Sequence, residues 1–472
     1  MKVLKNYIYN LTYQIVAIIL PLITIPYASR VLGAELIGIN SYTNTIISYF
    51  LLIANIGLTV YGNRTISYTR DDISKRSQKF WEILLIKLIM ALFSLVLFSI
   101  FILVYAHYQL FLCLQSIQIL ATAIDISWFF TGMEDFKKTV TRNIFTKILS
   151  AILILSLVNG KDDLWIYILI LASSTLLGNL TLWSYIFKFV ERCDLKSLQL
   201  KEHIKPVFIL FIPQLATTLF LTLNKLLLGN LSTLSQAGYF DSSDKVIRML
   251  LTFITAVGTV SFPRLANSFN NGHKGNVQKI LKLSFDAVSI IAFPMSVGML
   301  IAGETFSPLF FGSQFKGIEI VLGILSVELI FMGWSSILGN QFLVAINKTK
   351  GLTVSVFIAS FILLISSFIL IPILGATGAS ISSVIGEATI ALVQLYYVSK
   401  YTKLCLLFSD TPKFLVSSLI MGASCWVIGS YFYDGLIKLF VQGTVGLVVY
   451  CIMIWFSRPE IINTIVKKIN IR

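Results

Sequence analysis

Three basic residues lie in or beside long apolar segments, where a charge is costly. They are Arg30, Lys225 and Arg248. Charged side chains at membrane depth usually face a cavity or a partner, so they mark candidate binding sites. Arginine binds phosphate through two parallel hydrogen bonds, and lysine acts as a point charge. We therefore predict a cationic cavity for phosphate or pyrophosphate, although an ordinary outer loop would also account for Arg30 and Arg248.

Two further arginines and two acids extend this set. Arg64 and Arg264 stand at the ends of apolar runs, where they are expected to attract a charged headgroup or to anchor the helices. Asp125 and Glu328 fall in the middle of apolar runs. A buried carboxyl group there takes up a proton or pairs with a cation, so both are candidates for ion coupling, with plain helix-to-helix hydrogen bonding as the alternative.

Four other charged residues have a simpler structural interpretation. Lys87 and Lys147 lie within a turn or two of expected cytoplasmic ends, where a long side chain extends to the water interface. Asp286 and Glu387 are expected near an interface or paired internally.

Membrane-spanning helices must position these residues. The chain has 472 residues, a mean hydropathy of +0.85, and 56% hydrophobic against 12% charged residues, where soluble domains have about 25% charged. A bilayer core needs about 20 apolar residues per helix. The predicted fold is all-α and integral to the membrane, with about fourteen spans, at 8–28, 39–60, 83–104, 110–130, 141–158, 165–187, 206–226, 246–263, 283–302, 320–340, 352–371, 378–398, 413–432 and 436–456.

The basic residues predict the orientation. With the N-terminus inside, 28 of the 37 lysine and arginine residues fall in cytoplasmic segments, as the positive-inside rule requires. Both termini are therefore expected in the cytoplasm. This distribution also accounts for the net charge of +15 without nucleic acid as a partner.

The sequence shows no sign of a cofactor or an energy-converting domain. No expected loop is long enough for a catalytic domain, and no Walker A or Gly-rich phosphate loop is present. The five cysteines form no ligand or pairing pattern, so neither a metal nor a disulfide is predicted. Transport energy is expected from an ion gradient, the substrate's own gradient or a partner.

An internal repeat appears when the chain is shifted by 200 residues. Gly38, Leu51, Thr59, Val60 and Arg64 then coincide with identical residue types at 238, 251, 259, 260 and 264. The shift contains six spans, so the halves should run in the same direction, as in transporters with parallel repeats. We predict an N-lobe at 1–200, a C-lobe at 201–400, and two further helices with a cytoplasmic tail at 401–472.

Paired prolines support the same division. Pro21 and Pro26 in the first span correspond to Pro206 and Pro213 in the seventh. Proline interrupts the helical hydrogen-bond ladder, so bent helices are expected at equivalent places in each half.

Several segments in the first third of the chain resemble a known family. They are 10–14, 20–33, 38–42, 61–66 and 125–137, followed by Arg142 and Asn143. These segments are similar to those of Wzx-type polysaccharide repeat-unit flippases, members of the multidrug/oligosaccharidyl-lipid/polysaccharide exporter superfamily. The resemblance implies a substrate, an undecaprenyl-pyrophosphate-linked oligosaccharide moved from the inner to the outer leaflet of the bacterial cytoplasmic membrane. It also implies contact with membrane lipid, with a polysaccharide polymerase and glycosyltransferases as candidate partners.

Two other functions remain open from the sequence. A drug or cation exporter of the same superfamily would favour acids over cations in its cavity. A membrane-embedded glycan polymerase or acyltransferase would normally carry a long outer loop or a His/Asp/Arg cluster, whereas His107, His203 and His273 are expected singly in loops. The chain is therefore not expected to be an enzyme.

Overall fold

The computed structural model describes the chain except for residues 1, 106, 195–197, 260–264, 266, 270–273 and 470–472. Side chains are additionally left undescribed at 2–11, 256–259, 274 and 465–469. The described residues form helices and contain no strand, which confirms the predicted all-α class.

The chain divides into two compact units, Met1–Leu226 and Leu227–Arg472. The first contains α1 (Lys2–Asn55), α2 (Leu58–Thr69), α3 (Ile73–Val104), α4 (Gln109–Gln115), α5 (Ile117–Ala123), α6 (Ser127–Gly132), α7 (Phe136–Leu157), η1 (Lys161–Asp163), α8 (Leu164–Ile186) and most of α9 (Lys201–Leu231).

The second unit is also helical in its described part. It contains α10 (Leu234–Thr259), α12 (Lys274–Phe311), α13 (Ile318–Ser326), α14 (Glu328–Ser335), the π-helical turn η3 (Ser336–Leu343), α15 (Lys350–Leu374), α16 (Ala376–Ser399), α17 (Leu404–Leu407), α18 (Thr411–Gly429), α19 (Leu436–Ser457) and α20 (Glu460–Ile469). The sequence-based division at residue 200 stays a prediction.

Twelve helical stretches of the described chain are long and apolar enough to cross a membrane. The first, Thr12–Thr69, has 58 residues, whereas a single crossing needs about 20, so it is long enough for two. Within it α1 changes direction at Gly33, whose φ of 79° favours glycine. The polar helix α10 is not among the twelve. The chain is thus a multi-pass membrane protein, and the count of fourteen spans stays a prediction.

The first part of helix α9 packs against the core of the first unit. Val207 is buried in, and Phe211 packs against, a core cluster that includes Phe80 and Trp128. Gly57 has a φ of 79°, and a Cβ there would lie 3.0 Å from the Val207 carbonyl oxygen. A side chain at Gly57 would therefore push α9 away from α2.

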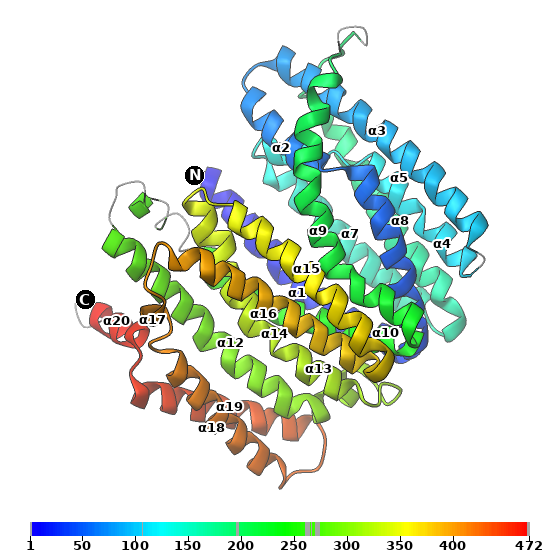
Figure 1. Cartoon of the computed structure of the whole chain (residues 1–472). Coiled ribbons are helices and arrows are strands. Elements are labelled where there is room, and N and C mark those ends of the chain that lie inside the picture. The colour runs from blue at the N-terminus through cyan, green and yellow to red at the C-terminus, as the bar shows by residue number, and fades with distance from the viewer. Residues whose placement is uncertain are drawn as a thin grey trace. The chain divides into compact units, whose positions relative to one another are not determined.

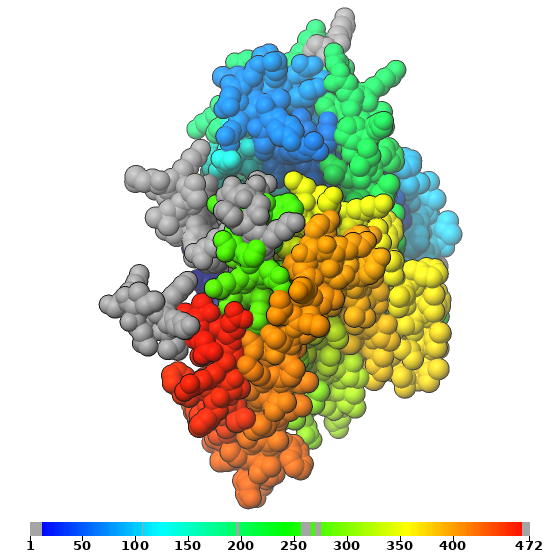
Figure 2. Space-filling view, turned by 60° about the vertical axis from the view of Figure 1, so that its left-hand side comes forward, coloured from blue at the N-terminus to red at the C-terminus, as the bar shows by residue number. Residues whose placement is uncertain are grey.

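The last helices of the chain form a layer on α12. Helices α18 and α19 contact one another and α12, and α20 also contacts α12. In Figure 1 α18 and α19 run side by side below α12, and Figure 2 shows the orange and red surface of the same segments as one continuous region. This layer lies within the second unit.

The paired prolines lie inside continuous helices. Helix α1 contains Pro21 and Pro26, and α9 contains Pro206 and Pro213. The break recorded within α1 falls at Gly33 instead.

Candidate functional site

Helix α10 carries two ion pairs, each formed one helical turn apart. The Lys245 Nζ atom lies 2.6 Å from Oδ2 of Asp241, and the Arg248 Nε atom lies 2.8 Å from Oδ1 of Asp244. Both carboxylates are buried, while the two basic side chains are partly exposed. The Asp-x-x-x-Lys and Asp-x-x-x-Arg spacing in the sequence was a signal for these pairs, because residues at i and i+4 are neighbours on a helix.

Two buried glutamates from neighbouring helices join this group. Glu328 on α14 and Glu387 on α16 both interact electrostatically with Arg248 and Asp244, and Glu328 is hydrogen-bonded to Ser383. The Oε1 atom of Glu328 has no hydrogen-bond partner among the described residues. Glu387, to which the sequence assigned only a structural role, therefore belongs to the same group as Arg248 and Glu328. We call Asp244, Arg248, Glu328 and Glu387 the acidic cluster.

The first unit contains a separate buried ion pair. The Lys87 Nζ atom donates to the Asp125 carbonyl oxygen at 2.7 Å and lies 3.8 Å from the carboxylate Oδ2. Arg142 adds an electrostatic interaction with Asp125 and donates to Asn179. The expectation that Lys87 extends to the interface is wrong: its side chain is 0% exposed, because the carboxylate and a free carbonyl oxygen give its ammonium partners inside the protein.

Asp125 also forms part of the wall of a polar cavity. The cavity measures about 370 Å³ and lies between α1, α2, α5 and α9 of the first unit. Hydroxyl and amide side chains dominate its lining, and Asp125 is its one charged lining residue. The lining consists of Ser48, Leu51, Leu52, Asn55, Thr59, Thr122, Asp125, Gln214, Thr218, Leu221 and Thr222.

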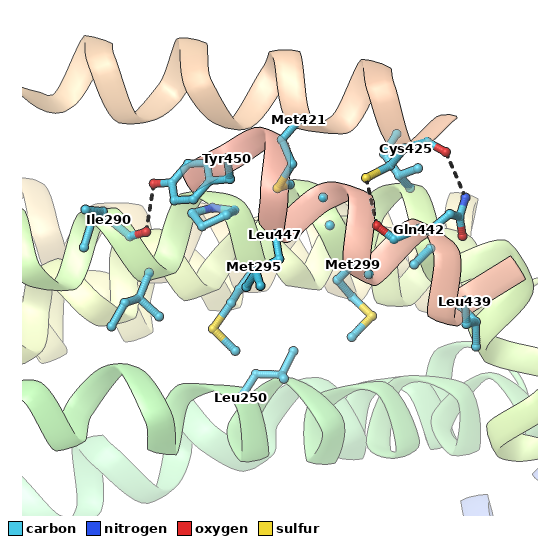
Figure 3. A pocket seen from close by; sticks show the side chains of 17 residues that line it. Leu250, Ile290, Met295, Met299, Met421, Cys425, Leu439, Gln442, Leu447 and Tyr450 are labelled. Carbon is cyan, nitrogen blue, oxygen red and sulfur yellow. Dashed lines mark hydrogen bonds between the residues drawn. The ribbon is translucent and has the colours of Figure 1, made fainter. Parts of the chain in front are cut away.

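The second unit contains an apolar groove of about 480 Å³ between α12, α18 and α19, with Leu250 of α10 opposite. Figure 3 shows Met295, Met299, Met421 and Leu447 around it. Three polar groups at its edges bond within the unit: Tyr450 donates to the Ile290 carbonyl oxygen at 2.8 Å, and the Gln442 Nε2 atom and the Cys425 thiol each donate to the other's carbonyl oxygen. The Oε1 atom of Gln442 has no partner among the described residues. The groove therefore offers an apolar surface and few polar contacts.

The predicted cations are distributed over both units. Arg30 is exposed on α1 and Lys225 is half-buried on α9, both in the first unit, while Arg248 belongs to the second. Arg64 is exposed on α2, where its guanidinium lies 5.5 Å from the ring centre of Tyr68. Arg264 lies outside the described residues. A single cavity lined by Arg30, Lys225 and Arg248 stays a prediction.

Two structural expectations were settled. Asp286 is paired internally, with its carboxylate 2.8 Å from Nζ of Lys282. His203 does not lie in a loop. It is buried on α9, where its ring nitrogens bond Glu82 at 2.7 Å and Tyr61 at 2.6 Å, which fixes the start of α9 to α2 and α3.

The fold is that of known flippases and multidrug transporters. The inward closed conformation of the lipid II flippase MurJ superposes with a TM-score of 0.76 at 16% identity, covering 96% of this chain and 99% of that one. An inward-facing transporter of the multidrug resistance MATE family gives a TM-score of 0.59 at 14% identity, covering 84% of this chain and 94% of that one. The protein is thus a multi-pass membrane protein with the fold shared by these two transporters.

The sequence places the chain more narrowly. It belongs to the polysaccharide biosynthesis protein family, whose family model matches residues 3–269. An Escherichia coli (strain K12) protein that carries the name O-antigen transporter is 23% identical over 400 residues, covering 84% of this chain and 96% of that protein. A Haloferax volcanii protein named as a low-salt glycan biosynthesis flippase is 25% identical over 238 residues, about half of each chain. The resemblance to polysaccharide flippases is confirmed.

Proposed function

We propose that the protein is a flippase that moves a lipid-linked oligosaccharide across a membrane. The observation that carries the proposal is family membership together with a relative, named as an O-antigen transporter, that the chain matches over 96% of its length. The two cavities support it, since a lipid-linked glycan has one polar and one apolar part. Translocation of this kind breaks and forms no covalent bond.

The substrate, the direction of transport and the residues that hold the pyrophosphate are proposed from the sequence and its resemblance to polysaccharide flippases. The substrate is an undecaprenyl-pyrophosphate-linked repeat unit, moved from the inner to the outer leaflet of the bacterial cytoplasmic membrane, with both termini of the protein in the cytoplasm. Arg30, Lys225 and Arg248 hold the pyrophosphate, because preplaced cations replace the hydration that a charged headgroup loses. Arg64 and Arg264 attract the headgroup at the cytoplasmic ends. The apolar groove of the second unit accommodates part of the lipid chain.

Ion coupling is assigned to Asp125 and Glu328. Each is a carboxylate in a membrane helix bundle with a cation close by, Lys87 for Asp125 and Arg248 for Glu328. A carboxylate in this setting can release its cation partner and take up a proton instead. If this exchange changes how the helices pack, it couples transport to an ion gradient.

A drug or cation exporter is the second candidate. One observation favours it: the acidic cluster holds three carboxylates and one guanidinium, and buried acids suit a cationic substrate. Efflux of an organic cation from cells that express the protein would support this alternative.

The test is translocation in proteoliposomes. The wild-type protein should move lipid-linked oligosaccharide, extracted from membranes of its native host, into the opposite leaflet, and imposed proton and sodium gradients identify the coupling ion. The triple variant Arg30→Ala, Lys225→Ala and Arg248→Ala should abolish transfer while the protein remains folded and inserted. It also carries Asp244→Asn, because loss of Arg248 would otherwise leave the buried Asp244 carboxylate without its cation. Transfer at the rate of protein-free liposomes by the wild type would contradict the proposal, and normal transfer by the triple variant would contradict the assignment of the cations.

A further inference from the structure

Three helices of the first unit carry polar side chains along one face each. On α1 they are Asn40, Asn44, Ser48 and Asn55. At 3.6 residues per turn these four positions lie within about 80° of arc, so they form one stripe. A polar stripe on a membrane helix must face other polar groups or water.

The span through α4 and α5 carries the second stripe. Gln115, Gln118 and Thr122 recur every three or four residues and lie within about 60° of arc, and Asp125 follows just beyond the end of α5. The third stripe lies on α9, with Gln214, Thr218, Thr222 and Lys225 at the same kind of spacing.

The second stripe meets the first directly, and the third bonds α1 at Tyr49, outside the first stripe. Gln118 donates through Nε2 to Oδ1 of Asn44 at 3.3 Å, and Thr222 donates to the hydroxyl of Tyr49 on α1 at 3.0 Å. Residues of all three stripes line the polar cavity of about 370 Å³, a volume within the range of small-molecule sites, about 300–1,000 Å³. All of these residues belong to the first unit.

Several polar groups around this cavity have unused hydrogen-bonding capacity. The Oε1 atom of Gln214 is buried without a partner among the described residues. Asn55 accepts from Thr59 at 2.8 Å through Oδ1, while no described residue accepts from its amide nitrogen. The Oδ2 atom of Asp125 lies 3.8 Å from Lys87, beyond hydrogen-bond distance. A buried polar group without a partner costs about 1–3 kcal/mol, so a polar ligand or water is expected here.

The chemistry of the lining selects among polar ligands. No cation lines the cavity to bind a pyrophosphate, and its one charged lining residue is a carboxylate, Asp125. An isoprenoid chain would cover the hydroxyl and amide groups without offering them hydrogen bonds. A sugar presents hydroxyl groups that donate and accept, and mixed amide and hydroxyl side chains complement it.

We propose that the three stripes form a glycan track in the first unit, a subsite that binds the uncharged sugars of the substrate separately from its pyrophosphate and its lipid. This inference rests on the proposed function, because it names which part of the lipid-linked oligosaccharide this cavity recognises. Sugar hydroxyl groups here supply the partner that the buried Gln214 Oε1 atom lacks.

The experiment is cysteine protection in the full-length protein, starting from a variant without its five native cysteines. Thr122→Cys and Thr218→Cys place a thiol in the cavity. Leu120→Cys is the matched control, since Leu120 lies on the same helix and is 46% exposed away from the cavity lining. A water-soluble methanethiosulfonate reagent should modify positions 122 and 218 and leave position 120 unmodified.

Three probes then identify the ligand. Lipid-linked oligosaccharide extracted from membranes of the native host should slow modification at 122 and 218 about tenfold, whereas undecaprenyl pyrophosphate without sugar and tetraphenylphosphonium should leave it unchanged. Equal protection by the bare carrier, protection by the organic cation, absence of protection, or a cavity that does not react would each overturn the glycan track.

Transport of the substitution variants separates this inference from the proposed function. Gln214→Leu combined with Thr218→Val should lower translocation of the oligosaccharide about tenfold, the equivalent of one or two neutral hydrogen bonds. Thr175→Val is the control, because Thr175 is exposed on α8 and donates only within its own helix. A wild type that transfers nothing contradicts the proposed function, whereas a wild type and a double variant with equal rates contradict the glycan track alone.

Discussion

The two cavities of this protein differ in chemistry although both lie among membrane helices. The cavity of the first unit is lined mainly by hydroxyl and amide groups and one carboxylate, whereas the groove of the second is lined mainly by methionine, leucine and isoleucine, with Gln442 and Tyr450 as its few polar residues. The hydrophobic effect favours an apolar chain in the groove, and unused hydrogen bonds favour a polar ligand in the cavity. The difference shows that one chain offers a polar and an apolar ligand environment, which is what the proposed function requires.

The largest expected effect comes from breaking the ion pair behind the polar cavity. Lys87→Ala leaves the Asp125 carboxylate buried without its closest cation, and removing one partner of a buried pair costs about 3–5 kcal/mol. We expect a large loss of folded protein, measured as a lowered midpoint of thermal unfolding in detergent.

A double variant sharpens this result. Lys87→Met with Asp125→Leu removes both charges and should recover most of the stability. It should still transport poorly, because the cavity loses its carboxylate. Equal stability of the single variant and the wild type would show that the pair does not support the cavity wall.

The second effect comes from filling the apolar groove. Gly443 lines it, and a Cβ at this position would meet nothing within 4 Å, so Gly443→Leu adds bulk to the groove without a clash at its first carbon. We expect translocation to fall about tenfold, or ~1.4 kcal/mol, with an unchanged unfolding midpoint. Gly275→Leu is the matched control, since Gly275 is equally open and lies outside the groove. Full transport by Gly443→Leu would exclude the groove from the pathway.

The smallest effect is expected at Arg64, which lies outside both cavities. Its guanidinium stacks on Tyr68 and its Nε donates to the Tyr68 hydroxyl at 3.2 Å, an exposed contact worth about 0.5–1 kcal/mol. Arg64→Ala should lower the initial transport rate about twofold to threefold, and Arg64→Lys should retain most of it. A loss as large as that of Gly443→Leu would place Arg64 in the pathway itself.

Several residues that the sequence singled out have partners that it did not predict. It singled out Arg248 and Glu328 from their cost in a membrane, and the structure brings them within electrostatic range of one another. It assigned Glu387 a structural role, because α10, α14 and α16, which are far apart in the chain, supply this group. It missed Asp244, although its spacing of four residues from Arg248 was a signal. It placed Lys87 at an interface because the residue is close to a helix end. Distance from a helix end gives the depth of a residue in the membrane, but it does not give the direction of its side chain.

By itself the sequence determined that this chain spans a membrane many times, that it is helical, and that it resembles polysaccharide flippases. Apolar length and charge distribution suffice for the first two conclusions because a bilayer accepts few alternatives. Only the tertiary structure decided that Lys87 pairs with Asp125, that α9 packs on the first unit, and that three polar stripes line one cavity. These features depend on which helix faces which, and periodicity gives the polar face of each helix without naming its neighbour.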